Sequence, residues 1–71
     1  HDVADRQLLT RFDNQVPLSA RSYNRGTEYL EDGQYEIAIQ EFTKAIQLDP
    51  DDADTYYNRG NSYIKLGQYQ K

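Results

Sequence analysis

Hydrophobic residues recur at helical spacing in two stretches of the chain, and a helix-stopping residue follows each stretch. In residues 20–32 the apolar positions fall on one side of a helix, and Gly33 follows. In residues 36–48 a second apolar stripe ends at Asp49-Pro50, where proline interrupts the helical hydrogen bonds. The stripes consist of Tyr23, Gly26, Tyr29 and Leu30, and of Ala38, Ile39, Phe42, Ala45 and Ile46. The pattern predicts a helical hairpin.

A third helix is expected after this hairpin. Asp52 is a suitable N-cap, because its carboxylate can accept from the first free N–H groups of a helix. The helix should run to Leu66, with Gly67 as its stop. The pattern therefore predicts an all-α chain.

The N-terminal segment, residues 1–18, has an apolar face of its own. Asp2 is a candidate N-cap, and the helix should run for about three turns and end near Asn14 and Pro17. Its apolar residues are Val3, Leu8, Leu9, Phe12 and Val16. We expect it to cap the end of the helical array. The alternative is a helix that docks on another chain.

The chain repeats itself with a period of 34 residues, because Tyr23-Asn24-Arg25-Gly26 recurs as Tyr57-Asn58-Arg59-Gly60. Tyr29 likewise recurs as Tyr63, and Gly33-Gln34-Tyr35 recurs as Gly67-Gln68-Tyr69. Eight of the 19 positions aligned in this way are identical, where chance gives about one. Such a period is typical of helix–turn–helix repeat arrays.

Residues 19–71 resemble the tetratricopeptide repeat family. The six residues that match the family pattern are Gly26, Tyr29, Ala38, Phe42, Ala45 and Pro50. The resemblance identifies residues 19–52 as one complete repeat. It identifies residues 53–71, with Gly60, Tyr63 and Tyr69, as the first half of a second repeat. The implied fold is a fragment of an α-solenoid, about one and a half repeats preceded by the N-terminal helix.

Two positions depart from the family pattern. The family's Trp position holds Ser22 in the first unit and Tyr56 in the second, and its Leu position holds Arg25 and Arg59. We expect these arginines to lie over Tyr rings or to pair with acids.

Gly26 and Gly60 lie inside predicted helices, where glycine is unfavourable. A close helix crossing explains the choice. Ala38 or Ala45 is the expected neighbour of Gly26.

Composition excludes several function classes. The chain has 71 residues and a net charge of −4, which argues against nucleic acid as a partner because phosphate binding needs a basic face. It has no Cys, and its single His is His1, so thiolate chemistry and a Ser-His-Asp triad are excluded. Mean hydropathy is −1.03, and no run suits membrane insertion. A soluble binding or assembly module remains. The absence of Cys fits the cytoplasm and also exported bacterial proteins, so localisation stays open.

The acidic residues do not form a recognisable catalytic or metal site. We expect them, Glu41 included, to be a solvated face with no buried general acid. The run from Asp49 to Asp54 lacks the Gly and the closing Glu of a calcium loop, and is better read as a turn with an N-cap. No enzyme activity, metal or cofactor is predicted.

The resemblance implies a concave groove lined by the first helix of each unit. The predicted peptide-binding residues are Tyr23, Asn24, Thr27, Tyr57, Asn58 and Asn61. The amides of Asn24 and Asn58 recur at the repeat period, and an amide offers a donor and an acceptor to a peptide main chain. The alternative is that these amides bond only within the helix pair. Clamping of a C-terminal carboxylate, known for some family members, is not predicted, because Tyr23 occupies the position of the clamp Lys.

The apolar side of the third helix has no partner in the predicted fold. Its exposed residues should be Tyr56, Tyr63, Ile64 and Tyr69. We expect either that the chain is a piece of a longer array, or that this open edge pairs with another chain and gives a homo-oligomer.

Overall fold

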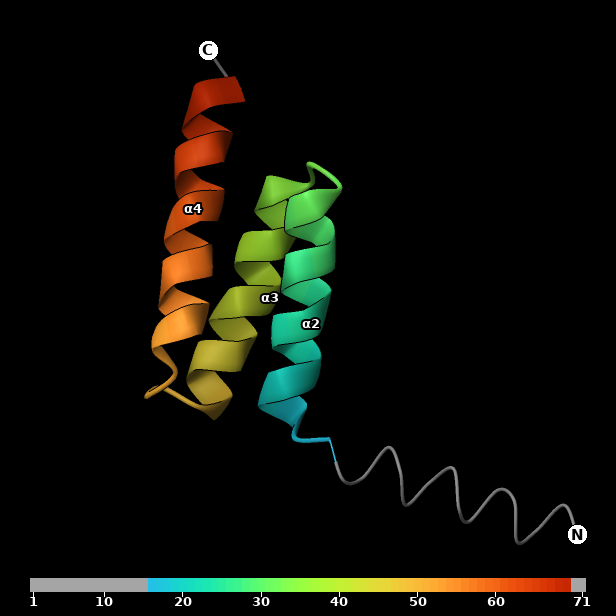
Figure 1. Cartoon of the computed structure of the whole chain (residues 1–71), viewed down its shortest axis with the longest axis vertical. Coiled ribbons are helices and arrows are strands. Elements are labelled where there is room, and N and C mark those ends of the chain that lie inside the picture. Colours follow the sequence, from blue (N-terminus) through green and yellow to red (C-terminus); the bar gives the residue numbers. More distant parts are fainter. Residues whose placement is uncertain (1–15, 70–71) are drawn as a thin grey trace, which may run out of the picture.

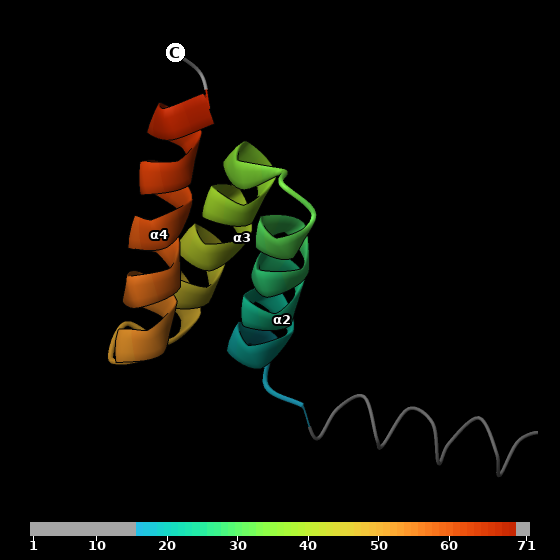
Figure 2. The same ribbon diagram turned by 45° about the horizontal axis from the view of Figure 1, so that its top comes forward.

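The computed structural model describes residues 16–69, which form three helices within that range. α2 (Leu18–Glu31) and α3 (Tyr35–Leu48) form an antiparallel hairpin, and α4 (Ala53–Tyr69) packs along α3 on the other side (Figures 1 and 2). The all-α class and the helical hairpin are confirmed. The predicted N-terminal segment, residues 1–18, lies outside the described residues except for residues 16–18, of which Leu18 begins α2.

The turn between α2 and α3 is set by Gly33, which has a φ of 80°. Gln34 N–H donates to the Tyr29 carbonyl at 2.9 Å, and Gly33 N–H donates to the Leu30 carbonyl at 3.2 Å. This pair of bonds is the Schellman motif, whose left-handed residue is normally glycine because a Cβ is unfavourable there. The predicted stop at Gly33 is confirmed.

The connection between α3 and α4 uses aspartate side chains. The Asp49 carboxylate accepts from Asp51 N–H at 3.3 Å, and the Asp52 carboxylate accepts from Asp54 N–H at 3.1 Å. The second bond satisfies an N–H in the first turn of α4, as the N-cap prediction requires.

The stop predicted at Gly67 is wrong, since α4 continues through it to Tyr69. Gly33 is the glycine with positive φ in the described part of the chain. The same Gly-Gln-Tyr sequence therefore forms a turn in the first unit and helix in the second.

The buried apolar core is small and comes from α3. Ala38, Phe42 and Ala45 are the buried hydrophobic residues of the described range, and Gly26 is the buried glycine opposite them on α2. A methyl group at Gly26 would lie 2.5 Å from Cε1 of Phe42. The close crossing predicted from Gly26 is confirmed. The three atoms nearest to such a methyl group all belong to the Phe42 ring, which takes the space that the missing side chain leaves.

Candidate functional site

The first helices of the two units, α2 and α4, are joined by one side-chain hydrogen bond. The Nδ2 group of Asn58 donates to the Tyr23 hydroxyl at 2.9 Å. The Tyr23 ring also packs against Phe42, with 5.9 Å between ring centroids. The bond therefore fixes the spacing of α2 and α4 on the side where binding residues are predicted.

The donor group of the Asn58 side-chain amide, Nδ2, already makes its hydrogen bonds within the chain. Besides the Tyr23 hydroxyl, its Nδ2 group donates to the Asp54 carbonyl one turn earlier, at 3.0 Å. An amide nitrogen carries two hydrogens, so both are used within the chain. What Asn58 can offer to a ligand is its oxygen Oδ1, an acceptor for a backbone N–H.

The equivalent position on α2 is more open. Asn24 is exposed, and its backbone carbonyl accepts from the Thr27 hydroxyl at 2.8 Å. Tyr57 is 61% exposed, and Asn61 is half-buried. All six predicted residues thus lie at i, i+1 and i+4 on their two helices. We call these six residues the α2–α4 face.

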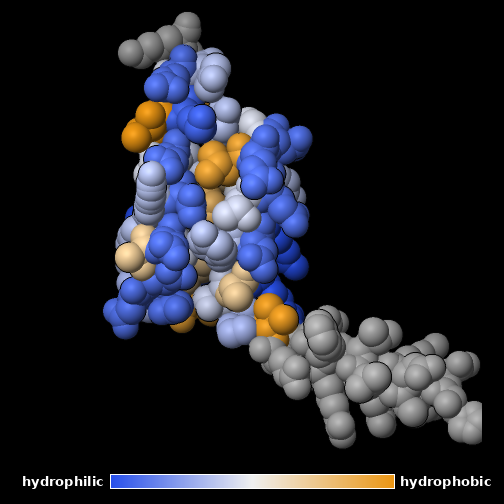
Figure 3. Space-filling view, viewed as in Figure 1, coloured by the Kyte–Doolittle hydropathy of each residue, from blue (hydrophilic) through white to orange (hydrophobic). Residues whose placement is uncertain are grey.

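Four positions of α4 share another side of the helix, at spacing i, i+4, i+7 and i+8. Tyr56, Gly60, Tyr63 and Ile64 are all exposed. A methyl group at Gly60 would meet nothing within 4 Å. We call these four residues the open face of α4. Figure 3 shows a mostly hydrophilic surface with a few separate hydrophobic patches, and Leu18, Ile37 and Leu48 are further exposed apolar residues.

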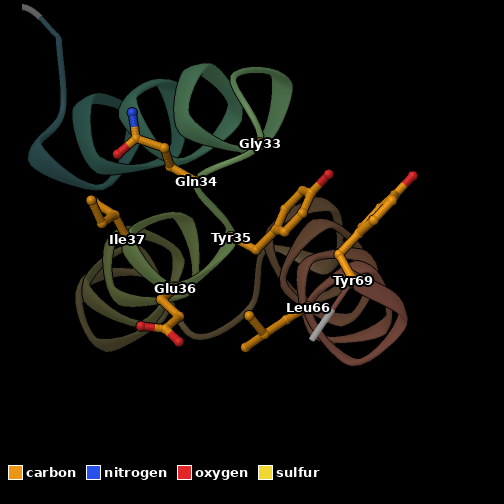
Figure 4. A pocket seen from close by; sticks show the side chains of 7 residues that line it. All are labelled: Gly33, Gln34, Tyr35, Glu36, Ile37, Leu66 and Tyr69. Carbon is orange, nitrogen blue, oxygen red and sulfur yellow. The ribbon is translucent and has the colours of Figure 1, made fainter. Parts of the chain in front are cut away.

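Tyr69 lies apart from the open face. Its ring stacks on Tyr35 of α3, with centroids 5.8 Å apart and planes 15° apart. The two rings border a cleft of about 370 Å³ between the start of α3 and the end of α4, which Leu66 also lines (Figure 4). Tyr69 is exposed as predicted, at 71%, but it contacts the first repeat.

Arg59 has the predicted aromatic contact. Its guanidinium lies 5.7 Å from the centroid of the Tyr56 ring and donates to the Thr43 hydroxyl at 3.3 Å. The arginine therefore ties one edge of the open face to α3.

Glu41 departs from the expectation that the acids are solvated, because it is only 9% exposed. Lys44, one turn along α3, lies 3.4 Å from Oε1, while Oε2 has no hydrogen-bond partner among residues 16–69. Sequence reasoning missed this burial, since Glu41 precedes Phe42 on a helix whose charged residues are otherwise exposed.

The described residues do not form a candidate metal site. No group of three or more His, Asp or Glu side chains in the range 16–69 could hold a metal ion. In the same range no helix combines the length and the apolar character needed to cross a membrane.

Comparison with known proteins gives one match. A family model described as TPR repeat, the tetratricopeptide repeat, matches residues 26–67. No curated protein and no solved structure matches the chain. The matched range covers the turn at Gly33, all of α3 and most of α4.

Proposed function

Because the chain belongs to the tetratricopeptide repeat family, we propose that it is an interaction module whose α2–α4 face binds a segment of a partner protein. Repeats of this family generally mediate protein–protein interaction and scaffolding, and they are not enzymes. The observation that carries the proposal is the double use of the Asn58 donors. The two bonds hold the Asn58 amide in one orientation and leave its oxygen as an acceptor.

The ligand for this face is a stretch of main chain. Oδ1 of Asn58 accepts from a backbone N–H, and the exposed amide of Asn24 supplies both a donor and an acceptor. Main-chain recognition requires no particular ligand side chain. With a net charge of −4, the chain favours a basic or neutral segment.

The test begins with peptides selected from a random displayed library against the whole chain. The double variant Asn24→Ala, Asn58→Ala should weaken the selected peptides at least about tenfold, equivalent to 1.4 kcal/mol. Gln40→Ala, an exposed amide on α3, is the matched control and should leave the affinity unchanged. Equal affinity for all three proteins would exclude the α2–α4 face.

N-methylation of the peptide then tests whether a backbone N–H of the peptide donates a hydrogen bond to Asn58. Methylating the one amide that faces Asn58 removes the donor that Oδ1 needs, so binding should fall at that position. If no single N-methylation weakens binding, the ligand is held through its side chains instead.

The open face of α4 supports a second candidate function, self-association into a homo-oligomer. Tyr63 and Ile64 are 54% and 59% exposed, and Gly60 has open space beside it. Light scattering after size exclusion should then give a mass above 8.3 kDa that rises with concentration. Ile64→Asp should return the mass to the monomer value, while Gln40→Ala should not. A constant mass of 8.3 kDa would exclude self-association.

A further inference from the structure

The two places where the first repeat departs from the family pattern line one cleft. Ser22 stands where the family has Trp, and Arg25 stands where it has Leu. Both residues line a cleft of about 280 Å³ between α2 and α3, which we call the basic cleft. Ser22 is 7% exposed, so a small hydroxyl takes a buried place that a large indole has in the family. The basic cleft is therefore a feature of this chain and does not follow from the family pattern.

The basic cleft concentrates positive charge in an acidic chain. Arg21, Arg25 and Lys44 line it, whereas the other Lys and Arg residues in the range 16–69, Arg59 and Lys65, do not. No Asp or Glu of that range lines it. The two arginines are one turn apart on α2, and Lys44 comes from α3. The arrangement therefore surrounds one space with three cations from two helices.

Glu41 lowers the charge of this cluster but does not cancel it. Its Oε1 lies 3.4 Å from Nζ of Lys44, so the carboxylate offsets the charge of that lysine. The two arginines then supply the net positive charge of the cleft. A guanidinium can hold a carboxylate through two parallel hydrogen bonds, which an ammonium group does not offer.

Two exposed leucines also line the basic cleft. Leu18 at the start of α2 is 60% exposed, and Leu48 at the end of α3 is 52% exposed. Covering them removes apolar surface from water, which favours a ligand with a hydrophobic side chain. The cleft therefore offers charge for an acidic group and apolar surface for a hydrophobic one.

We infer that the basic cleft binds an acidic segment of a partner protein. The segment places an Asp or Glu carboxylate among the three cations and an adjacent apolar side chain on Leu18 and Leu48. A single acidic side chain fits better than a polyanion such as nucleic acid, because the chain as a whole carries a net charge of −4. The basic cleft shares no residue with the α2–α4 face, so the inference goes beyond the proposed function. The two surfaces then take partners of different charge.

The test uses a displayed library of short peptides that have a fixed central Glu and random flanking residues, selected against the full chain. Selected peptides, followed by fluorescence anisotropy, should bind saturably and carry an apolar residue beside the Glu. Replacing that Glu by Gln should weaken binding at least about tenfold. Failure to select any peptide, or equal affinity of the Glu and Gln peptides, would overturn the inference. Residues 1–15 are part of the full chain, so a cleft that they cover would also give this negative result.

Arg25→Leu is the decisive variant of the chain. Arg25 is exposed and leucine is the family's own residue, so the variant should fold, which helical circular dichroism checks. Its affinity for the selected peptides should fall at least about tenfold, and Arg25→Lys should retain more of it. Lys65→Leu, at an exposed position of α4 outside the cleft, is the matched control and should bind normally. Equal losses in Arg25→Leu and Lys65→Leu would show charge attraction without a site and would overturn the inference.

This inference and the proposed function can fail separately. The double variant Asn24→Ala, Asn58→Ala should bind the acidic peptides normally. If it loses them while Arg25→Leu keeps them, the peptides bind the α2–α4 face, and the basic cleft fails alone. If Arg25→Leu lowers a solution mass that rises with concentration in the wild type, the occupant is the acidic turn of a second copy, residues 49–54. That result would also overturn the inference of an acidic partner.

Discussion

Tyr35 and Tyr69 occupy the same place in successive repeats, and their rings stack on each other with centroids 5.8 Å apart. Tyr35 is the first residue of α3, and Tyr69 is the last residue of α4. The stack therefore ties the end of α4 to the turn at Gly33. The two rings are repeat equivalents of each other, 34 residues apart in the sequence.

Removing either ring of this stack should destabilise the chain by about 0.5 to 1 kcal/mol beyond the loss of buried area. The measurement is a double-mutant cycle of Tyr35→Ala and Tyr69→Ala in urea unfolding, where the coupling energy isolates the pair. Tyr57→Ala, at an exposed position of α4 away from the stack, should show no coupling with Tyr35→Ala. A coupling energy near zero for Tyr35 with Tyr69 would mean that the stack does not form in solution.

Gly26 and Gly60 are equivalent in sequence and should respond oppositely to alanine. Gly26→Ala forces a methyl group into the buried Phe42 ring and should cost about 1 to 3 kcal/mol, as over-packing of a core does. Gly60→Ala meets nothing and should stabilise α4 by up to about 1 kcal/mol.

Thermal or urea unfolding of the two glycine variants measures both effects. Each variant is the control for the other, because the exchange is the same within the same Tyr-Asn-Arg-Gly sequence. Equal changes in the free energy of unfolding for Gly26→Ala and Gly60→Ala would contradict the difference in packing.

Tyr23→Phe should lower the free energy of unfolding by about 0.5 to 1 kcal/mol. The variant keeps the ring against Phe42 and removes only the hydroxyl that accepts from Asn58. Urea unfolding gives the value, and Tyr57→Phe is the matched control at the equivalent exposed position, where the change should be within about 0.5 kcal/mol. The two variants would behave alike if the bond between α2 and α4 were absent.

Glu41→Met should raise stability by about 1 kcal/mol. Glu41 is 9% exposed, and one of its oxygens lacks a partner among the described residues, so the desolvation of the carboxylate is poorly compensated. Methionine has a similar length and needs no partner. Chemical denaturation compares it with Glu31→Met, an exposed acid on α2 that should change stability little. A clear loss of stability in Glu41→Met would show that the Lys44 contact outweighs desolvation.

Asp52→Ala should cost about 1 kcal/mol, because it removes the acceptor for the Asp54 N–H in the first turn of α4. Urea unfolding and helical circular dichroism report the loss. Asp52→Asn retains an acceptor and should recover most of it. Failure of Asp52→Asn to recover stability would point to the charge rather than the cap.

The three described helices could be predicted because their signals act over a few residues. Gly33 permits positive φ, Pro50 removes a backbone donor, and Asp52 caps the next helix, each by local chemistry. The 34-residue period carried the family assignment, since the repeated residues keep a fixed spacing.

Tertiary packing decided the features that identical local sequences leave open. Gly33 and Gly67 lie in the same Gly-Gln-Tyr sequence, yet Gly33 has a positive φ at a turn and Gly67 lies within α4. Likewise the Phe42 ring occupies the space beside Gly26, while the space beside Gly60 is open. The neighbouring residues in the sequence determine which helix a residue belongs to and on which side of that helix it lies. Contacts between helices set which ring lies on a glycine and which carboxylate is buried.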